Sequence, residues 1–356
     1  MGRNFSLARI AAALAVLLLA LAACGRPQQP NELPRLLGYL PPLSANADPA
    51  EATVSFSELA SLKQACQYQE DAALSTMPAS QKKPFAACIA PAGLCPSLAA
   101  YQQAGLEMDI GYDVTAVHRC IEGSGVLFLE GAFDTQRVIA RLQERSYDAS
   151  AYEGVNTYHL NDSQYTGTAA ERGLAAPVGH VAVVRGGIYL AASPEHLQAA
   201  LDTWARRSDS LSRNTSYAAL VEALGPTIRA VLLPRAGRLL ALGYQQETTR
   251  QTVYYSKPAA PCDGPNAPAY TWRSRDEIAL VRNIVVACTA ADAADADAEA
   301  QRLYTALGAL PHAANWELPG RPDVLDTTDP PIARVVLGLQ AEAEGGLPDE
   351  LAGVWP

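Results

Sequence analysis

The sequence predicts an α+β fold, in which an antiparallel sheet has helices packed on one face. Short apolar runs follow one another across glycine-containing turns, which favours antiparallel pairing of neighbouring strands. Between these runs lie amphipathic segments that begin at residues typical of helix N-caps. With 49% hydrophobic and 18% charged residues, the chain also has the composition of a packed globular protein.

The pattern is clearest between residues 113 and 206. Apolar and polar residues alternate from Val114, and the turn at 123–125 leads into a second apolar run. Asp134 and Ser193 are expected to cap two helices, because each precedes apolar residues at helical spacing. The expected elements are strands at 114–118, 126–129, 152–160, 178–184 and 188–192, and helices at 134–145 and 193–204.

Weaker patterns flank this region. A helix is expected before it, over residues 57–68, where apolar residues recur at helical spacing. After it, the expected elements are strands at 228–233, 251–255, 277–288 and 332–339, and helices at 217–224 and 292–310. The two parts share a rough strand–helix–strand rhythm. They therefore form either one body or two ferredoxin-like-type units.

Four segments are predicted along the chain: a signal peptide, a Pro-rich tether, an α+β domain and a smaller α+β domain. Their bounds are 1–23, 24–50, 51–233 and 234–356, and the last two are also compatible with one body. Six prolines between Arg26 and Pro49 favour an extended spacer, because proline fixes φ and lacks a hydrogen-bond donor. The end of the tether is open, since four of its residues are suited to docking on the body: Leu36, Leu37, Tyr39 and Leu40.

The N-terminus has the features of a secretory signal. Arg3 and Arg9 precede an apolar run over residues 10–20, which is shorter than the roughly 20 residues that a helix needs to cross a bilayer. The run ends in the sequence Leu-Ala-Ala-Cys at residues 21–24, which resembles the lipobox of bacterial lipoproteins. The resemblance covers only the first 24 residues, but its pattern is specific.

This resemblance implies cleavage before Cys24 and lipid on that cysteine. Two or three acyl chains form a stable anchor where a single chain is marginal. The expected location is therefore outside the cytoplasm, on the outward face of the cell membrane or on the outer membrane of a diderm cell. The membrane, contacted through lipid on Cys24, is the first predicted partner. An ordinary signal peptide with a chance cysteine, or an uncleaved anchor, is the alternative.

The charge balance is acidic. Without residues 1–23, which carry two arginines and no acidic residue, the net charge falls from −10 to −12. An acidic body disfavours nucleic acid, or an anionic headgroup surface, as the main partner.

The remaining cysteines are expected to form disulfides, because an even number of cysteines in an exported chain is typical of a disulfide framework. The six are Cys66, Cys88, Cys95, Cys120, Cys262 and Cys288. Four lie in the first third of the chain and two in the last third, so pairing is expected within each group. Cys262 with Cys288 is the preferred pair. A metal site is disfavoured, because the sequence has no Cys-x-x-Cys.

No catalytic residue, cofactor site or metal site is predicted. Phosphate-binding loops and the His-Glu-x-x-His motif are absent, and Ser124 lies in a turn that explains it without a nucleophilic role. The acidic cluster over residues 292–299 lacks the turn glycine of a calcium loop and suits a helix start.

A surface carrying Tyr152 and Tyr158 is the candidate binding surface, since tyrosine offers contact area and a polar tip. The expected function is that of a membrane-anchored, non-catalytic binding or interaction module of the cell envelope. Its expected partner is an envelope protein or a small ligand, not nucleic acid. The alternatives are a solute-binding lipoprotein that serves a transporter and an envelope hydrolase of unrecognised class.

Overall fold

The computed structural model describes most of the chain after residue 30. The described residues are 31–43, 52–60, 95–98, 110–112, 114–161, 179–235, 238–245, 249–258, 270–279, 283–309, 316–318 and 321–339. The described residues from Glu32 onward belong to one compact unit. The predicted boundary between residues 233 and 234 falls inside a strand of this unit.

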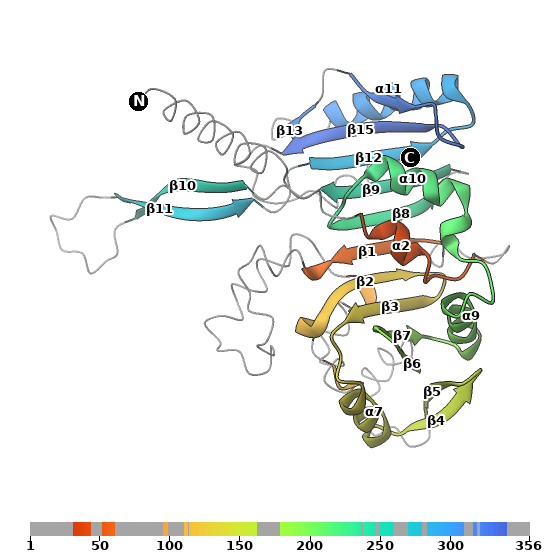
Figure 1. Cartoon of the computed structure of the whole chain (residues 1–356). Helices are drawn as coiled ribbons and strands as arrows, with labels where there is room; N and C mark the ends of the chain where they lie inside the picture. The colour runs from red at the N-terminus through yellow and green to blue at the C-terminus, as the bar shows by residue number, and fades with distance from the viewer. Residues whose placement is uncertain are drawn as a thin grey trace, which may run out of the picture. The chain divides into compact units, whose positions relative to one another are not determined.

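Thirteen strands form one antiparallel sheet (Figure 1). They are β1 (Val54–Glu58), β2 (Val117–Gly123), β3 (Val126–Gly131), β4 (Tyr147–Tyr152), β5 (Val155–Leu160), β6 (His180–Val184), β7 (Gly187–Ala191), β8 (Arg229–Arg235), β9 (Arg238–Gln245), β12 (Asn283–Thr289), β13 (Trp316–Glu317), β14 (Asp323–Leu325) and β15 (Ile332–Leu339). Twelve of them follow the order β13-β15-β12-β9-β8-β1-β2-β3-β7-β6-β5-β4, and β14 also pairs with β15. A separate two-stranded sheet consists of β10 (Thr249–Pro258) and β11 (Tyr270–Ala279).

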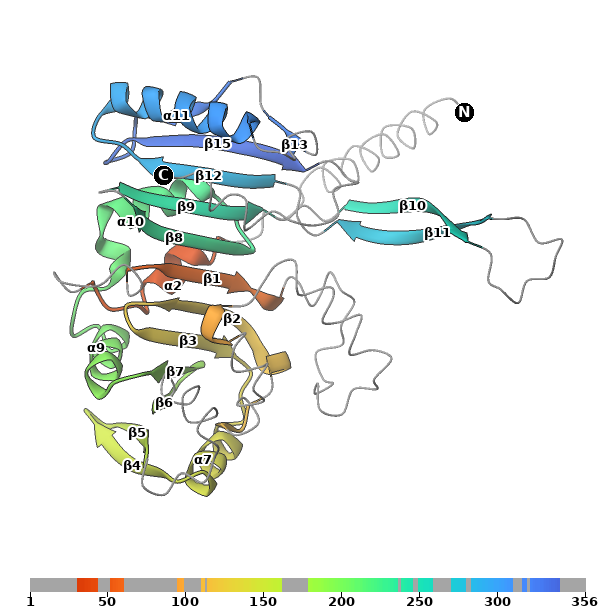
Figure 2. The ribbon, with the colours of Figure 1, turned by 180° about the vertical axis from the view of Figure 1, so that it is seen from behind.

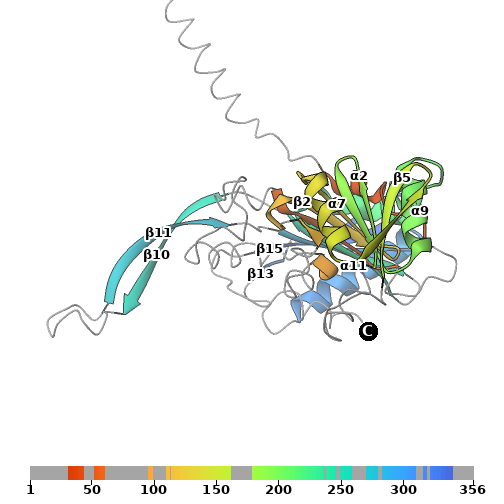
Figure 3. The ribbon, with the colours of Figure 1, turned by 90° about the horizontal axis from the view of Figure 1, so that it is seen from below.

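Helices cover both faces of the large sheet. They are α2 (Leu33–Leu37), α7 (Thr135–Glu144), α9 (Pro194–Trp204), α10 (Thr215–Leu224) and α11 (Ala293–Gly308). Buried residues of α7 and α11 belong to one hydrophobic cluster, and those of α2, α9 and α10 belong to another. Figures 1 and 2 show the sheet from opposite sides, with α10 and α2 in front in one view and α11 in front in the other. Seen from below in Figure 3, α11 and α2 lie on opposite sides of the strands.

The predicted fold class is therefore wrong in its architecture. The sequence predicts an antiparallel sheet with helices on one face, as one body or as two ferredoxin-like-type units, whereas the structure has one large sheet between two helical layers. The central strand β1 joins the two halves, because it pairs with β2 on one side and β8 on the other. This long-range pairing leaves no local signal in the sequence.

Burial on both faces explains why several strands are apolar without alternation. In β12, Ile284 and Val286 pack into the cluster of α7 and α11, while Val285 and Ala287 pack into the other cluster. A strand that is covered on both sides gains from apolar residues at every position. The prediction of helices on one face assumes that each apolar strand packs against a single layer of helices.

Helix caps are the best-predicted local features. Asp134 accepts hydrogen bonds from the backbone N–H groups of Gln136 and Arg137, and the hydroxyl of Ser193 accepts one from the N–H of His196. These bonds satisfy donors that an α-helix leaves unpaired in its first turn. The expected helix starts at 134 and 193 are thus confirmed.

Turns account for the strands that were predicted too long. The expected strand 152–160 is instead the end of one strand and the whole of the next, because Glu153 and Gly154 turn the chain with φ of 48° and 83°. Positive φ at both central residues is typical of a tight hairpin. Similarly, the expected strand 277–288 divides between β11 and β12. The expected helix 57–68 begins one residue before the end of β1, so its start is also wrong.

The segment just after the predicted signal region belongs to the folded body. Leu33, Leu36, Leu37 and Leu40 are at most 1% exposed. The hydroxyl of Tyr189 donates to the carbonyl of Tyr39 at 3.1 Å, which fixes the end of α2 against the sheet. The part of the predicted tether that the structure describes is therefore docked.

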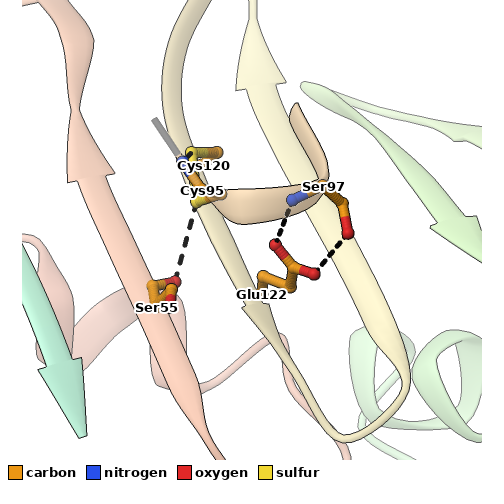
Figure 4. Close-up of a disulfide and its surroundings, with 5 residues drawn as sticks. All are labelled: Ser55, Cys95, Ser97, Cys120 and Glu122. Carbon is orange, nitrogen blue, oxygen red and sulfur yellow. Dashed lines mark hydrogen bonds between the residues drawn. A yellow bond between two sulfur atoms is a disulfide. The ribbon is translucent and has the colours of Figure 1, made fainter. Parts of the chain in front are cut away.

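A disulfide joins the segment 95–98 to β2 (Figure 4). Cys95 and Cys120 have Cα atoms 6.2 Å apart, and the bond confirms the expected pairing within the first cysteine group. Beside it, the backbone N–H and the hydroxyl of Ser97 both donate to the carboxylate of Glu122, at 3.0 and 2.5 Å. Covalent and hydrogen bonds together hold this short segment on the sheet.

Candidate anion-binding groove

An open cavity of about 890 Å³ lies where α2, the β6–β7 turn and the C-terminal end of α9 meet. We call it the arginine groove. It is lined by Arg35, Gly38, Tyr39, Arg185, Thr203, Trp204, Arg206, Arg207, Ser208, Asp209, Ser210 and Arg213. Its volume lies within the roughly 300–1,000 Å³ typical of small-molecule sites.

The end of α9 positions one wall of the groove. The helix ends at Trp204, and Arg206 follows with a φ of 58°, while its backbone N–H donates to the carbonyl of Thr203 at 3.0 Å. A left-handed residue at this position is a common way for a helix to end. It turns the chain so that the next residues run along the groove to the 3₁₀ turn η4 (Leu211–Arg213).

Arginine is the most frequent residue in the lining of the groove, although the protein is acidic as a whole. Five arginines line it against one acidic side chain, that of Asp209. The guanidinium of Arg213 lies 3.1 Å from that carboxylate, and both side chains are exposed. Two further arginines pair with acidic side chains outside the lining, so the uncompensated positive charge is that of the remaining two.

Arg207 is held in place by neighbouring side chains. Its guanidinium donates to Asp202 at 2.8 Å and lies 5.8 Å from the ring centre of Tyr152, whose hydroxyl donates to the same carboxylate at 3.1 Å. The hydrogen bond to Asp202 raises the pKa of both Arg207 and Tyr152. Arg207 thus enters the groove wall with its charge already compensated.

Arg35 belongs to a second group of charges, which we call the Arg119 network: Glu32, Arg35, Glu58, Arg119 and Glu130. Arg119 contacts Glu58 at 2.5 Å and Glu130 at 2.9 Å, and Arg35 contacts Glu130 at 2.7 Å and Glu32 at 2.6 Å. Burial disfavours the charge on Arg119, yet hydrogen bonds to Glu130 and Glu58 outweigh it and raise its pKa. Burial likewise disfavours the charge on Glu130, but its two arginines outweigh that effect and lower its pKa.

Arg185 and Arg206 differ from the other three arginines. Neither forms an ion pair within the described part of the chain, and both are exposed. Arg185 begins the β6–β7 turn, and Arg206 follows the end of α9. These two guanidinium groups are available to a ligand.

A structural explanation covers only part of this cluster. Arginines near a helix C-terminus complement its negative dipole end, which suits Arg206 and Arg207 after α9. Arg35 is explained by its ion pairs with Glu32 and Glu130, whereas Arg185 lies on another element and gains nothing from that dipole. The convergence of basic side chains from several elements therefore points to a binding role.

All five basic residues of the groove are arginines rather than lysines. A guanidinium presents planar donors that match the oxygens of carboxylate and phosphate groups. The arrangement is thus suited to binding an oxyanion.

The two tyrosines of the predicted binding surface do not share a sheet face. Tyr152 ends β4 and packs against the cluster of α2, α9 and α10, whereas Tyr158 lies in β5, is 3% exposed and belongs to the other cluster. Both contribute to a smaller pocket of about 270 Å³ that also contacts His159 and His180. Tyr152 is in addition connected to the arginine groove through Asp202.

Most of the other candidate residues lie outside the described part of the chain. This holds for Cys24, Cys66, Cys88 and Cys262. Cys288 carries a free, fully buried thiol, and burial raises its pKa to about 12. The structure thus gives no support for the expected pair of Cys288 with Cys262.

Ser124 and the acidic cluster have structural roles. Ser124 is 7% exposed, and its hydroxyl donates to the carbonyl of Pro41 at 2.9 Å. Asp292 caps α11 by accepting from the N–H of Asp295, and Asp295 pairs with Arg238 at 2.8 Å. No group of three or more His, Cys, Asp or Glu side chains suited to a metal ion occurs among the described residues.

Sequence reasoning missed the groove because its residues are far apart along the chain. Along the chain, the strands from β1 to β6 lie between Arg35 and Arg185. The one available signal was the pair Arg206-Arg207 in a polar loop directly after an amphipathic helix. This signal is weak, because the sequence contains another pair of consecutive basic residues, Lys82-Lys83.

Comparisons of the chain with protein-family models, with curated proteins and with solved structures find no match. Among the helices that the structure describes, none has the length and apolar character needed to span a bilayer.

Proposed function

We propose that the protein is an exported, lipid-anchored and non-catalytic binding module of the cell envelope, whose ligand is an anion held in the arginine groove. The carrying observation is the pair Arg185 and Arg206, two exposed arginines without an ion pair in the described residues, in a cavity of about 890 Å³. The resemblance of residues 21–24 to a lipobox supports the anchored part of the proposal.

The concave form of the site favours a discrete ligand over a flat charged surface. A net charge of −10 over the whole chain repels large anionic surfaces, whereas a small anion in the groove experiences mainly the nearby arginines. The acidic character of the body and the basic character of the groove are therefore compatible.

Anion binding is tested with the full-length protein in a neutral detergent. Inorganic phosphate, pyrophosphate and citrate are titrated by calorimetry into the wild type and into a double variant, Arg185→Gln with Arg206→Gln. We expect at least one anion to bind, and its affinity to fall about tenfold or more in the variant, because each lost charge-assisted hydrogen bond is worth about 1.5–3 kcal/mol.

A matched control is Arg141→Gln, since Arg141 is an exposed arginine on α7 and is not part of the groove. Its affinity should equal that of the wild type. Equal affinities in the double variant and the wild type would contradict the assignment of the site.

The anchor is tested separately. Cys24→Ala should move the protein from the membrane fraction to the soluble fraction, because the variant lacks the thiol that receives lipid. Continued membrane association of this variant would refute lipid anchoring but would leave the groove untouched.

A further inference from the structure

Trp204 is the most distinctive uncharged residue of the groove. It is the last residue of α9, and its side chain is half-buried in the groove wall. Part of its ring packs against the hydrophobic cluster of α2, α9 and α10, and no aromatic, cation–π or hydrogen-bonding partner of the ring occurs in the described part of the chain. Tyr39, by contrast, stacks on Phe128 at 4.7 Å and has Arg35 at 5.7 Å from its ring centre.

The part of the Trp204 ring that does not pack on the cluster remains exposed in the groove wall, where it is costly to leave in water. In a cavity it offers a flat apolar surface together with an N–H donor. Such a surface has no use for inorganic phosphate, which has no apolar face. It suits a ligand that carries a ring beside its anionic group.

The other polar groups of the groove match hydroxyl groups. Asp209 pairs with Arg213 through one carboxylate oxygen, and the other oxygen can accept from a ligand. Ser208 and Ser210 each share one hydrogen bond with a neighbouring hydroxyl and keep further capacity to donate or accept. A carbohydrate hydroxyl donates to the first and exchanges hydrogen bonds with the other two. Nucleobases and plain hydrocarbon rings make less use of this set.

We infer that the arginine groove takes an anionic carbohydrate, in which a sugar ring packs on Trp204 and a phosphate or carboxylate group lies between Arg185 and Arg206. This inference rests on the proposed anion-binding function and narrows its ligand class. Either a phosphate or a carboxylate group would satisfy this site, because arginine forms charge-assisted hydrogen bonds with both.

The test uses four kinds of probe with the full-length protein: inorganic phosphate, neutral glucose, glucose 6-phosphate and glucuronate. Calorimetry gives the affinities, and fluorescence of the wild type against Trp204→Phe reports whether the ring is contacted. We expect a charged sugar to bind about tenfold or more tightly than either phosphate or glucose. The stronger of the two charged sugars identifies the anionic group.

Two variants separate the roles within the site. Trp204→Ala should weaken the charged sugar at least fivefold and leave inorganic phosphate unchanged, whereas Arg185→Gln should weaken both. Trp204→Phe keeps a flat ring and should retain most of the affinity, and its melting temperature reports whether the fold is intact.

The outcomes distinguish the carbohydrate inference from the broader proposal of an anion-binding groove. Phosphate binding as tight as that of the charged sugars, with no effect of Trp204→Ala, would overturn the carbohydrate inference and preserve the anion groove. Binding of neutral glucose as tight as that of the charged sugars would overturn it as well. Failure of every anion, charged sugars included, would refute the proposed function together with this inference.

Discussion

The arginine groove and the Arg119 network use the same side chain in opposite ways. In the network, Arg119 meets Glu58 at 2.5 Å and Glu130 at 2.9 Å, and its side chain is 23% exposed. In the groove, Arg185 and Arg206 are exposed and have no acidic partner within the described residues. We call an arginine saturated when acidic side chains compensate its charge. Arg119 is saturated in this sense, whereas Arg185 and Arg206 are not.

Whether an arginine is saturated should distinguish a structural role from the proposed ligand-binding role better than its position in the groove does. Arg35 illustrates this point, because it lines the groove and yet pairs with Glu32 and Glu130. We therefore expect it to act mainly on stability, as Arg119 does. The following variants test this division, from the largest effect on stability to the smallest.

Arg119→Met should have the largest effect. It keeps much of the side-chain volume but removes the cation beside Glu58, whose side chain is 8% exposed. We expect the free energy of unfolding to fall by about 2 to 3 kcal/mol, below the full cost of breaking a buried pair because Arg119 itself is partly exposed. Urea unfolding measures it, and anion affinity should be unchanged. A change under 0.5 kcal/mol (roughly the scale of ordinary surface substitutions) would place Arg119 with the unsaturated residues.

Acid should reveal the network through Glu130. Its pKa is lowered in the folded protein from an ordinary value of 4.5, so its contribution to stability is present above that value and disappears as the pH falls through the lower, folded-state pKa. Unfolding free energy measured from pH 6 downward should fall less steeply in Glu130→Gln than in the wild type. Glu144→Gln, on the exposed face of α7, is the matched control and should follow the wild type. Identical slopes in all three would contradict the role of Glu130.

Arg35→Gln is expected to be intermediate. It removes contacts to Glu32 and Glu130, but Glu130 keeps Arg119. The loss of stability should be about 1 kcal/mol, as for a partly exposed pair. Anion affinity should fall less than threefold. A tenfold fall would show that a saturated arginine still serves the ligand.

Arg185→Gln with Arg206→Gln should affect stability least. These side chains form no ion pairs in the described residues, so the change in unfolding free energy should stay within about 0.5 kcal/mol while the anion affinity falls. A gain in stability would also fit, because it would show that uncompensated charges are kept for binding at a structural cost. A large loss would assign both residues to the fold.

Local signals predicted much of the secondary structure, and long-range pairing set the limits. Asp134, Ser193 and Asp292 marked helix starts correctly, since a cap is a property of a few consecutive residues. The strand β1 was missed because its place depends on β2 and β8, which lie far along the chain. The groove was missed for the same reason, since Arg35, Arg185 and Arg206 meet only after the sheet and its helices are assembled.

The docking of α2 also limits the length of free chain between Cys24 and the folded body. If Cys24 carries the lipid, eight peptide steps separate it from Glu32, and a chain of that length reaches at most about 28 Å. A free tether ending at residue 50 would have allowed roughly three times that reach. Arg35 follows three residues after Glu32, so the wall of the groove that it forms would lie within about 40 Å of the lipidated cysteine along the chain. A ligand fixed farther from the anchoring membrane than this reach would not contact that wall of the groove.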